Sequence, residues 1–172
     1  MIKKIRWLLP LLMATLVSAC GYQVTGLKST HLPEHIRSLA IPVFENTSTE
    51  PVLQRSLTEA LRRAFIHDGR LQLAGEKRAD LVMKGTLTRY SIRAVAFNAN
   101  DIATEYWVYL NVTVKVTERV AGTVHLDQKL RTRWDYRASS SVISSEVSRQ
   151  EALSQAYRDL SERLVSLLLD QF

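Results

Sequence analysis

A stretch of twelve residues in the second half of the chain, from Tyr106 to Thr117, alternates strictly between two kinds of side chain. The even-numbered positions are aromatic or branched aliphatic, namely Tyr106, Val108, Leu110, Val112, Val114 and Val116. The odd-numbered positions carry Trp107, Tyr109, Asn111, Thr113, Lys115 and Thr117. Because successive side chains of a β-strand point to opposite faces of its sheet, this pattern predicts a long strand with one buried face.

The segments on either side are predicted to pair with this strand. After a tight turn at residues 121–122, residues 124–137 keep an apolar face and place charged side chains on the other. Residues 80–97 switch the parity of their apolar positions part-way, and a β-bulge near residues 89–90 would explain the switch. Three adjacent long strands with one polar face indicate an antiparallel meander that is covered on one side only.

Apolar residues three and four positions apart predict two amphipathic helices, at residues 51–67 and 145–170. We expect Thr49 to cap the first helix at its N-terminus. Gly69 suits the left-handed position that follows a helix C-terminus.

Two more strands complete the predicted fold. Residues 36–44 are apolar and rich in branched side chains, and Pro42, which cannot donate a backbone hydrogen bond, indicates a sheet edge or a bulge there. Residues 71–73 predict a short strand. The order β-α-β-β-β-β-α predicts an α+β two-layer sandwich, in which a largely antiparallel four-stranded sheet, plus the short strand, carries both helices on one face.

The N-terminus has the features of a secretory signal peptide, with basic residues, a mostly apolar run and two small residues before Cys20. This ending resembles a bacterial lipobox, which implies that residues 1–19 are removed and that Cys20 carries a diacylglycerol and a fatty acyl chain. We expect residues 20–35 to form a lipidated tether and residues 36–172 a single domain. Gly21, where some bacteria use aspartate to retain lipoproteins in the inner membrane, favours the periplasmic side of the outer membrane.

Composition narrows the function classes. Without Lys3, Lys4 and Arg6 of the signal, 20 basic residues remain against 17 acidic ones, a mild formal charge of +3 that argues against a nucleic-acid binder. Cys20 is the only cysteine, so no internal disulfide forms. Membrane contact would rest on the lipid anchor.

Residues suited to catalysis or metal binding are few. His31 and His35 have metal-ligand spacing only in a helix, and Pro33 lies between them. The single cysteine is expected to be acylated, and no glycine-rich phosphate loop or nucleophile elbow occurs. We therefore expect no enzyme, no catalytic residue, no metal site and no cofactor other than the acyl groups.

Two features favour binding. The open sheet face is predicted to carry a basic set, comprising Lys115, Lys129, Arg131, Arg133 and Arg137. Guanidinium groups suit phosphates and carboxylates, although a merely solvated face that includes Asp127 and Asp135 is the alternative. The second feature is a pair of small polar loops at one end of the sheet, residues 98–103 and 138–144, which are either binding tips or inert.

A series of short motifs along the mature chain resembles one family. The motifs are Cys20-Gly21-Tyr22, Leu32-Pro33, Leu39-Ala40-Ile41-Pro42-Val43-Phe44-Glu45-Asn46-Thr47, Glu50-Pro51, Leu57-Thr58-Glu59-Ala60-Leu61, Asp68-Gly69-Arg70-Leu71, Asp80, Gly85-Thr86-Leu87 and Glu105-Tyr106. Together they resemble the lipopolysaccharide-assembly lipoproteins, the E component of the lipopolysaccharide transport machinery.

The resemblance implies a lipoprotein that plugs and supports a large outer-membrane β-barrel, the D component of the translocon, and helps to insert lipopolysaccharide into the outer leaflet. It also implies lipopolysaccharide binding through basic residues near one end of the sheet. Residues 98–103 contain no lysine or arginine. The nearest candidates are Arg93, Arg131, Arg133 and Arg137.

A second family is similar over a shorter stretch. Residues 39–61 also resemble regulatory outer-membrane lipoproteins that activate a cell-wall (peptidoglycan) synthase. A soluble periplasmic lipid carrier is a third reading, but the sequence pattern shows no large apolar cavity.

Overall fold

Six strands and two helices make up the part of the chain that the structure, a computed structural model, describes: residues 32–139 and 141–172. In chain order these elements are β1 (Ser38–Ala40), β2 (Glu45–Asn46), α2 (Leu53–Asp68), β3 (Gln72–Leu73), β4 (Leu81–Phe97), β5 (Ala103–Glu118), β6 (Val124–Arg137) and α3 (Val142–Leu169). The predicted signal peptide, Cys20 and residues 20–31 of the tether lie outside the described residues.

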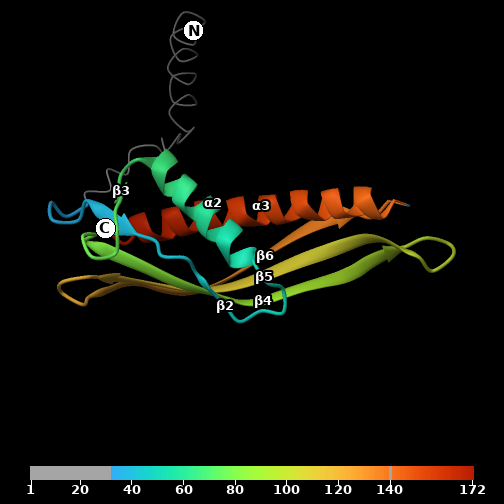
Figure 1. The fold of residues 1–172 in the computed structure, drawn as a ribbon, viewed down its shortest axis with the longest axis horizontal. Helices are drawn as coiled ribbons and strands as arrows, with labels where there is room; N and C mark the ends of the chain where they lie inside the picture. The colour runs from blue at the N-terminus through green and yellow to red at the C-terminus, as the bar shows by residue number, and fades with distance from the viewer. Residues whose placement is uncertain (1–31, 140) are drawn as a thin grey trace, which may run out of the picture.

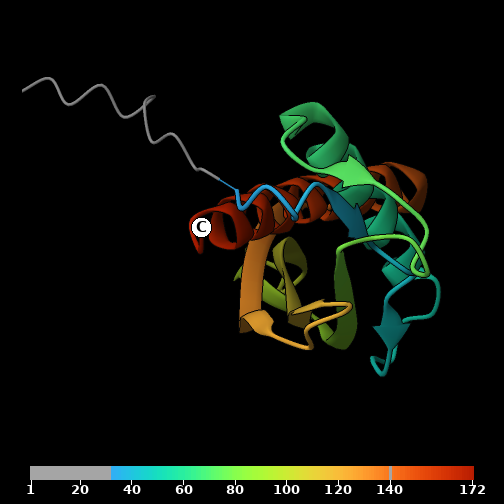
Figure 2. The same ribbon diagram turned by 90° about the vertical axis from the view of Figure 1, so that its left-hand side faces the viewer.

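The architecture is a mixed α+β sandwich in which the two helices lie over one sheet (Figures 1 and 2). α3 runs along the sheet, and α2 crosses it at an angle. Leu61 of α2 and Leu160 of α3 belong to the same buried core as Leu110 of β5. Both helices therefore cover the same face of the sheet.

The predicted meander is confirmed, because β4, β5 and β6 are long and antiparallel. The phase change in β4 is a bulge: Leu87 pairs with Val112, whereas Arg89 already pairs with Asn111, so Thr88 is the additional residue. Beyond the bulge Tyr90 lies on the helix side, where it packs against the core.

The predicted four-stranded antiparallel sheet is incomplete. The sheet has six strands in the order β3-β1-β4-β5-β6, with β2 also paired to β4, and β1, β2 and β3 all pair in parallel. The strand predicted at residues 36–44 is split, because Ala40 and Glu45 are five positions apart whereas their partners in β4 are four positions apart. Pro42 lies in this break, where its missing N–H costs no ladder bond.

The start of α2 also differs from the prediction. The helix begins at Leu53, and the preceding Val52 has a φ of 77° and makes no side-chain cap, so Thr49 is not the cap. The turn is held by Asn46 instead, whose amide donates to the Glu50 carbonyl at 2.8 Å.

The other helix ends are closer to expectation. Gly69 has a φ of 77° and its N–H donates to the Phe65 carbonyl at 3.1 Å, which confirms its predicted role. α3 begins three residues earlier than predicted, after Ser141, whose Oγ accepts from the Ser144 N–H. The described residues before β1 already contact the domain, since the Ile36 N–H donates to the Pro33 carbonyl and Leu32 packs against the core.

Candidate functional site

The candidate site lies on the face of the sheet that is turned away from the helices. The even-numbered residues of β5 from Val108 to Val116 are in the core, so its odd-numbered residues, including Trp107 and Tyr109, lie on the opposite face. β6 contributes Arg131 and Arg133 to this face, one strand away. We call Trp107, Tyr109, Arg131 and Arg133 the arginine–aromatic cluster.

Each arginine of the cluster lies over an aromatic ring. The Cζ atom of Arg131 is 4.4 Å from the centre of the Tyr109 ring, and that of Arg133 is 4.2 Å from the centre of the Trp107 ring. The register pairs Arg131 with Asn111 and Arg133 with Tyr109. Each arginine side chain therefore extends diagonally, over the ring two residues before its direct partner on β5. The two rings meet edge to face, with centres 6.3 Å apart. The four side chains thus form one continuous contact surface.

Cation–π contact fixes the two guanidinium groups without using their N–H bonds. Arg131 covers Tyr109 so well that this open-face residue is only 9% exposed. Among the described residues neither arginine side chain forms an ion pair. Stacked guanidinium groups with free N–H edges are suited to bidentate binding of phosphate or carboxylate.

The structure brings three of the four predicted arginines together. Arg93 of β4 pairs with Trp107 and so flanks the arginine–aromatic cluster from the other side of β5. Arg137 lies farther along β6, opposite Glu105. All four predicted arginines are exposed, and all come from the two strands that border β5.

Register adds a basic residue that the sequence analysis missed. Arg89 pairs with Asn111, which in turn pairs with Arg131, so the three side chains form one row across the sheet. The bulge at Thr88 decides this placement, and only a pairing of strands could have revealed it. Acidic residues interrupt the same face, since Asp135 of β6 pairs with Trp107.

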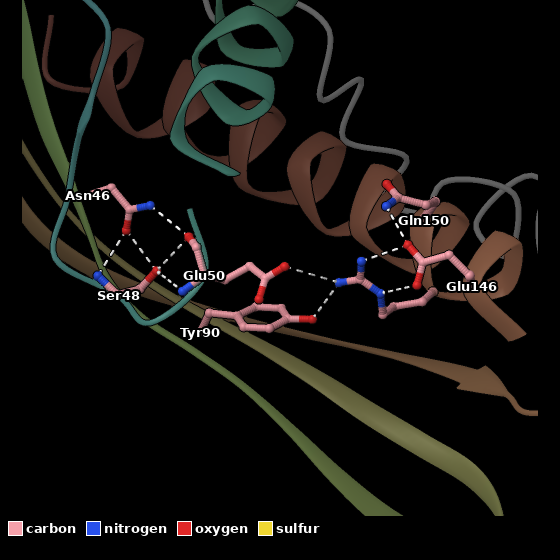
Figure 3. Close-up of polar contacts among 7 residues, drawn as sticks. Asn46, Ser48, Glu50, Tyr90, Glu146 and Gln150 are labelled. Carbon is pink, nitrogen blue, oxygen red and sulfur yellow. Dashed lines mark hydrogen bonds and ion pairs between the residues drawn. The ribbon is translucent and has the colours of Figure 1, made fainter. Parts of the chain in front are cut away.

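A polar network on the helix side holds α3 to the sheet near this end (Figure 3). Arg149 donates to the Tyr90 hydroxyl at 2.9 Å and to Glu146 at 2.7 and 2.8 Å, and its guanidinium lies 3.9 Å from Glu50. The hydrogen bonds from Arg149 and then Gln150 lower the pKa of Glu146 to about 2. Burial raises the pKa of Tyr90. This network positions the strand that carries Arg93.

The loop at the end of β4 is closed by its own hydrogen bonds. The Asn98 side chain accepts from the N–H groups of Asn100 and Ile102. The Asn98 N–H in turn donates to the Ile102 carbonyl at 2.9 Å. Phe97 and Ile102 are largely exposed. This end of the sheet therefore offers two apolar side chains beside a polar loop, and the nearby positive charges come from the strands.

Two of the three histidines of the described region lie beside one acidic residue. His35 and His125 both approach Glu118, at 3.6 and 3.3 Å, and the ring of His125 contacts Phe172. Within residues 32–139 and 141–172, no group of three or more histidine, cysteine or acidic residues is placed to hold a metal ion. In the same residues no helix is long and apolar enough to cross a membrane.

Solved structures with the same fold include several bacterial lipoproteins. An uncharacterized lipoprotein B from Nitrosomonas europaea matches with a TM-score of 0.56 and 12% identity over 86% of this chain and 88% of that one. The rare lipoprotein B from Shewanella oneidensis has a TM-score of 0.54, 13% identity and coverage of 74% and 93%. A minor lipoprotein from Acinetobacter baumannii has a TM-score of 0.53 and 16% identity over 78% of this chain and 92% of that one. At these identities the likeness shows the fold alone.

The family assignment comes from a comparison of the sequence with family models. Among curated proteins, no sequence matches the chain. The model of the family LptE, described as lipopolysaccharide-assembly, matches residues 36–168 and so covers almost the entire described domain. The chain belongs to the LptE family of lipopolysaccharide-assembly lipoproteins.

Proposed function

We propose that this lipoprotein is anchored to the periplasmic side of the outer membrane through Cys20. It would act without catalysis, as a plug and support for the β-barrel of the lipopolysaccharide translocon, the D component. Its open sheet face would line the hydrated interior of the barrel and bind lipopolysaccharide during insertion into the outer leaflet. The family match supports the assembly role, and the two-sided sheet supports the plug. A barrel lumen is polar, so the polar face can meet it without burying unpaired charges.

The observation that carries the binding proposal is the arginine–aromatic cluster. Lipopolysaccharide presents phosphate groups next to sugars, and stacked guanidinium groups bind phosphate while aromatic rings pack against sugar faces. Arg131 and Arg133 are already held in place by Tyr109 and Trp107, so binding immobilises little further side-chain freedom. Arg93 and Arg137 would extend the cationic surface on either side.

Binding of purified lipopolysaccharide to the mature protein tests the proposal. We expect R131Q/R133Q to weaken binding roughly a hundredfold or more, because each of the two lost charged hydrogen bonds contributes about 1.5–3 kcal/mol. R55Q is the matched control, since Arg55 is an exposed arginine on α2, away from the open face. If the double variant has normal thermal stability and unchanged affinity, the arginines do not bind lipopolysaccharide and are simply part of a solvated face.

Co-purification from detergent extracts tests the partner and separates the two families considered. We expect the translocon barrel to be recovered with the protein. Recovery of a cell-wall synthase and no barrel would overturn the plug proposal in favour of a synthase regulator. Labelling with a fatty-acid probe tests the anchor, and C20A should abolish the label.

A further inference from the structure

A groove runs between α2 and α3, on the helix side of the molecule and away from the arginine–aromatic cluster. Its volume is about 630 Å³, within the usual range for sites that hold one small molecule. Apolar parts of both helices line it, including Ala60 and Ala64 of α2 and Val165 of α3. We call this feature the helix groove.

Two arginines without partners border the helix groove from opposite helices. Arg63 belongs to α2 and Arg158 to α3, and neither forms a hydrogen bond or an ion pair within the described residues. Elsewhere on the rim, Asp68 is already neutralised by Arg70, with 2.7 Å between the closest charged atoms. The two arginines therefore present unpaired positive charge to the groove, although Glu162 and Asp170 also line it.

A buried hydroxyl in the lining also has no partner. Ser161 lies on α3 one turn after Arg158, lines the helix groove and is only 1% exposed. Its Oγ is the one buried side-chain polar atom in the described residues that makes no hydrogen bond. Native structures satisfy most buried hydroxyls, so an orphaned one in the lining of a cavity is a candidate partner for a bound water or ligand.

We propose that the helix groove binds a fatty acid. The carboxylate would bind Arg63 and Arg158 and accept from the Ser161 hydroxyl, and the alkyl chain would lie along Ala64 and Val165. A single acyl chain with one anionic end matches an apolar lining that has its unpaired cations on opposite walls. Glu162 also borders the groove and opposes the carboxylate. This site is independent of the surface proposed for lipopolysaccharide.

Fluorescence titration with 11-(dansylamino)undecanoic acid tests the proposal. The full mature chain with C20A serves as the protein, because it needs no detergent that would compete for an alkyl site. We expect saturable binding of one probe per chain, roughly tenfold weaker in R63Q/R158Q, because two charged hydrogen-bond donors are lost. E162Q should bind more tightly. Both arginines are exposed, so these variants are expected to fold.

Three comparisons make the result decisive. R55Q should bind like the parent, and S161A, which removes only the hydroxyl, should weaken binding. Decanoate should displace the probe far better than decanol, which has the same chain length without the charge. Equal affinity in R63Q/R158Q, or equal displacement by the two competitors, would overturn the proposal. Lipopolysaccharide binding should be unchanged in R63Q/R158Q, so this proposal and that for the open face fail separately.

Discussion

Substitution of Gly85 by alanine is expected to destabilise the domain through one identifiable overlap. Gly85 lies in the first half of β4, opposite Val114, and the Phe44 ring occupies the space where its side chain would begin. A Cβ built at Gly85 would lie 2.6 Å from Cδ2 of that ring, well inside van der Waals contact. Phe44 is only 3% exposed and cannot swing into solvent. Either the ring or the strand must therefore shift.

The size of the effect follows from two opposing contributions. Overpacking a core costs about 1–3 kcal/mol, and replacing a strand glycine by alanine returns about 0.5 kcal/mol of backbone entropy. We expect G85A to lower the free energy of unfolding by about 1–2 kcal/mol. With a urea m-value of about 2 kcal/mol/M, the unfolding midpoint would fall by roughly 0.5–1 M.

Urea unfolding of the mature protein, followed by tryptophan fluorescence, measures this shift. G75A is the matched control, because a Cβ at Gly75 meets nothing within 4 Å and the residue does not have a positive φ. F44L in the G85A background should recover part of the loss, since a smaller side chain relieves the overlap. A wild-type midpoint for G85A, or an equal loss for G75A, would refute the reasoning.

Three further predictions use the same measurement. T132V should lower the free energy of unfolding by about 1 kcal/mol, because the Thr132 hydroxyl donates to Asp159 at 2.6 Å. If the two side chains act as a pair, the double variant D159N/T132V should lose no more stability than T132V alone. V52G should stabilise the protein by about 1 kcal/mol, because Val52 is a branched residue at a φ of 77°; a lower midpoint would show that the strain is absent. Hydrogen bonds from Ser38 and from the Arg37 N–H lower the pKa of Asp80, so its stabilising effect is present above about pH 4 and is lost as the pH falls through the lowered value. D80N should therefore be less stable than wild type at pH 7 and should approach it in acid, and a difference independent of pH would contradict this.

Local patterns predict the long elements well because each pattern records a single buried face. The alternation in β5 and the three- and four-residue spacing in α3 arise from contact with one core, and both elements form within a few residues of the predicted bounds. Of the short parallel strands, β3 forms where residues 71–73 predict a strand, whereas β1 and β2 differ from the single strand predicted at residues 36–44. β1 and β2 have three and two residues, too few to show a period, and they form because β4 offers an edge to pair with.

The start of α2 shows why helix caps are harder to predict. Thr49 has a suitable side chain, but Asn46 fixes the preceding turn through Glu50 and Gln54, and this leaves Val52 at the cap position. A capping preference of about 1 kcal/mol is easily outweighed by such contacts.

For β5 and β6, the sequence alone determined which residues lie on the open face of the sheet, because parity along an unbroken strand is a local property that needs no partner. It placed Arg131 and Arg133 on that face together with Trp107 and Tyr109. Only the tertiary structure decided which ring each arginine covers, that Arg93 flanks them, and that Arg63 and Arg158 border the same helix groove. Strand register and helix crossing bring together residues far apart in the chain, and both are set by packing of the entire core.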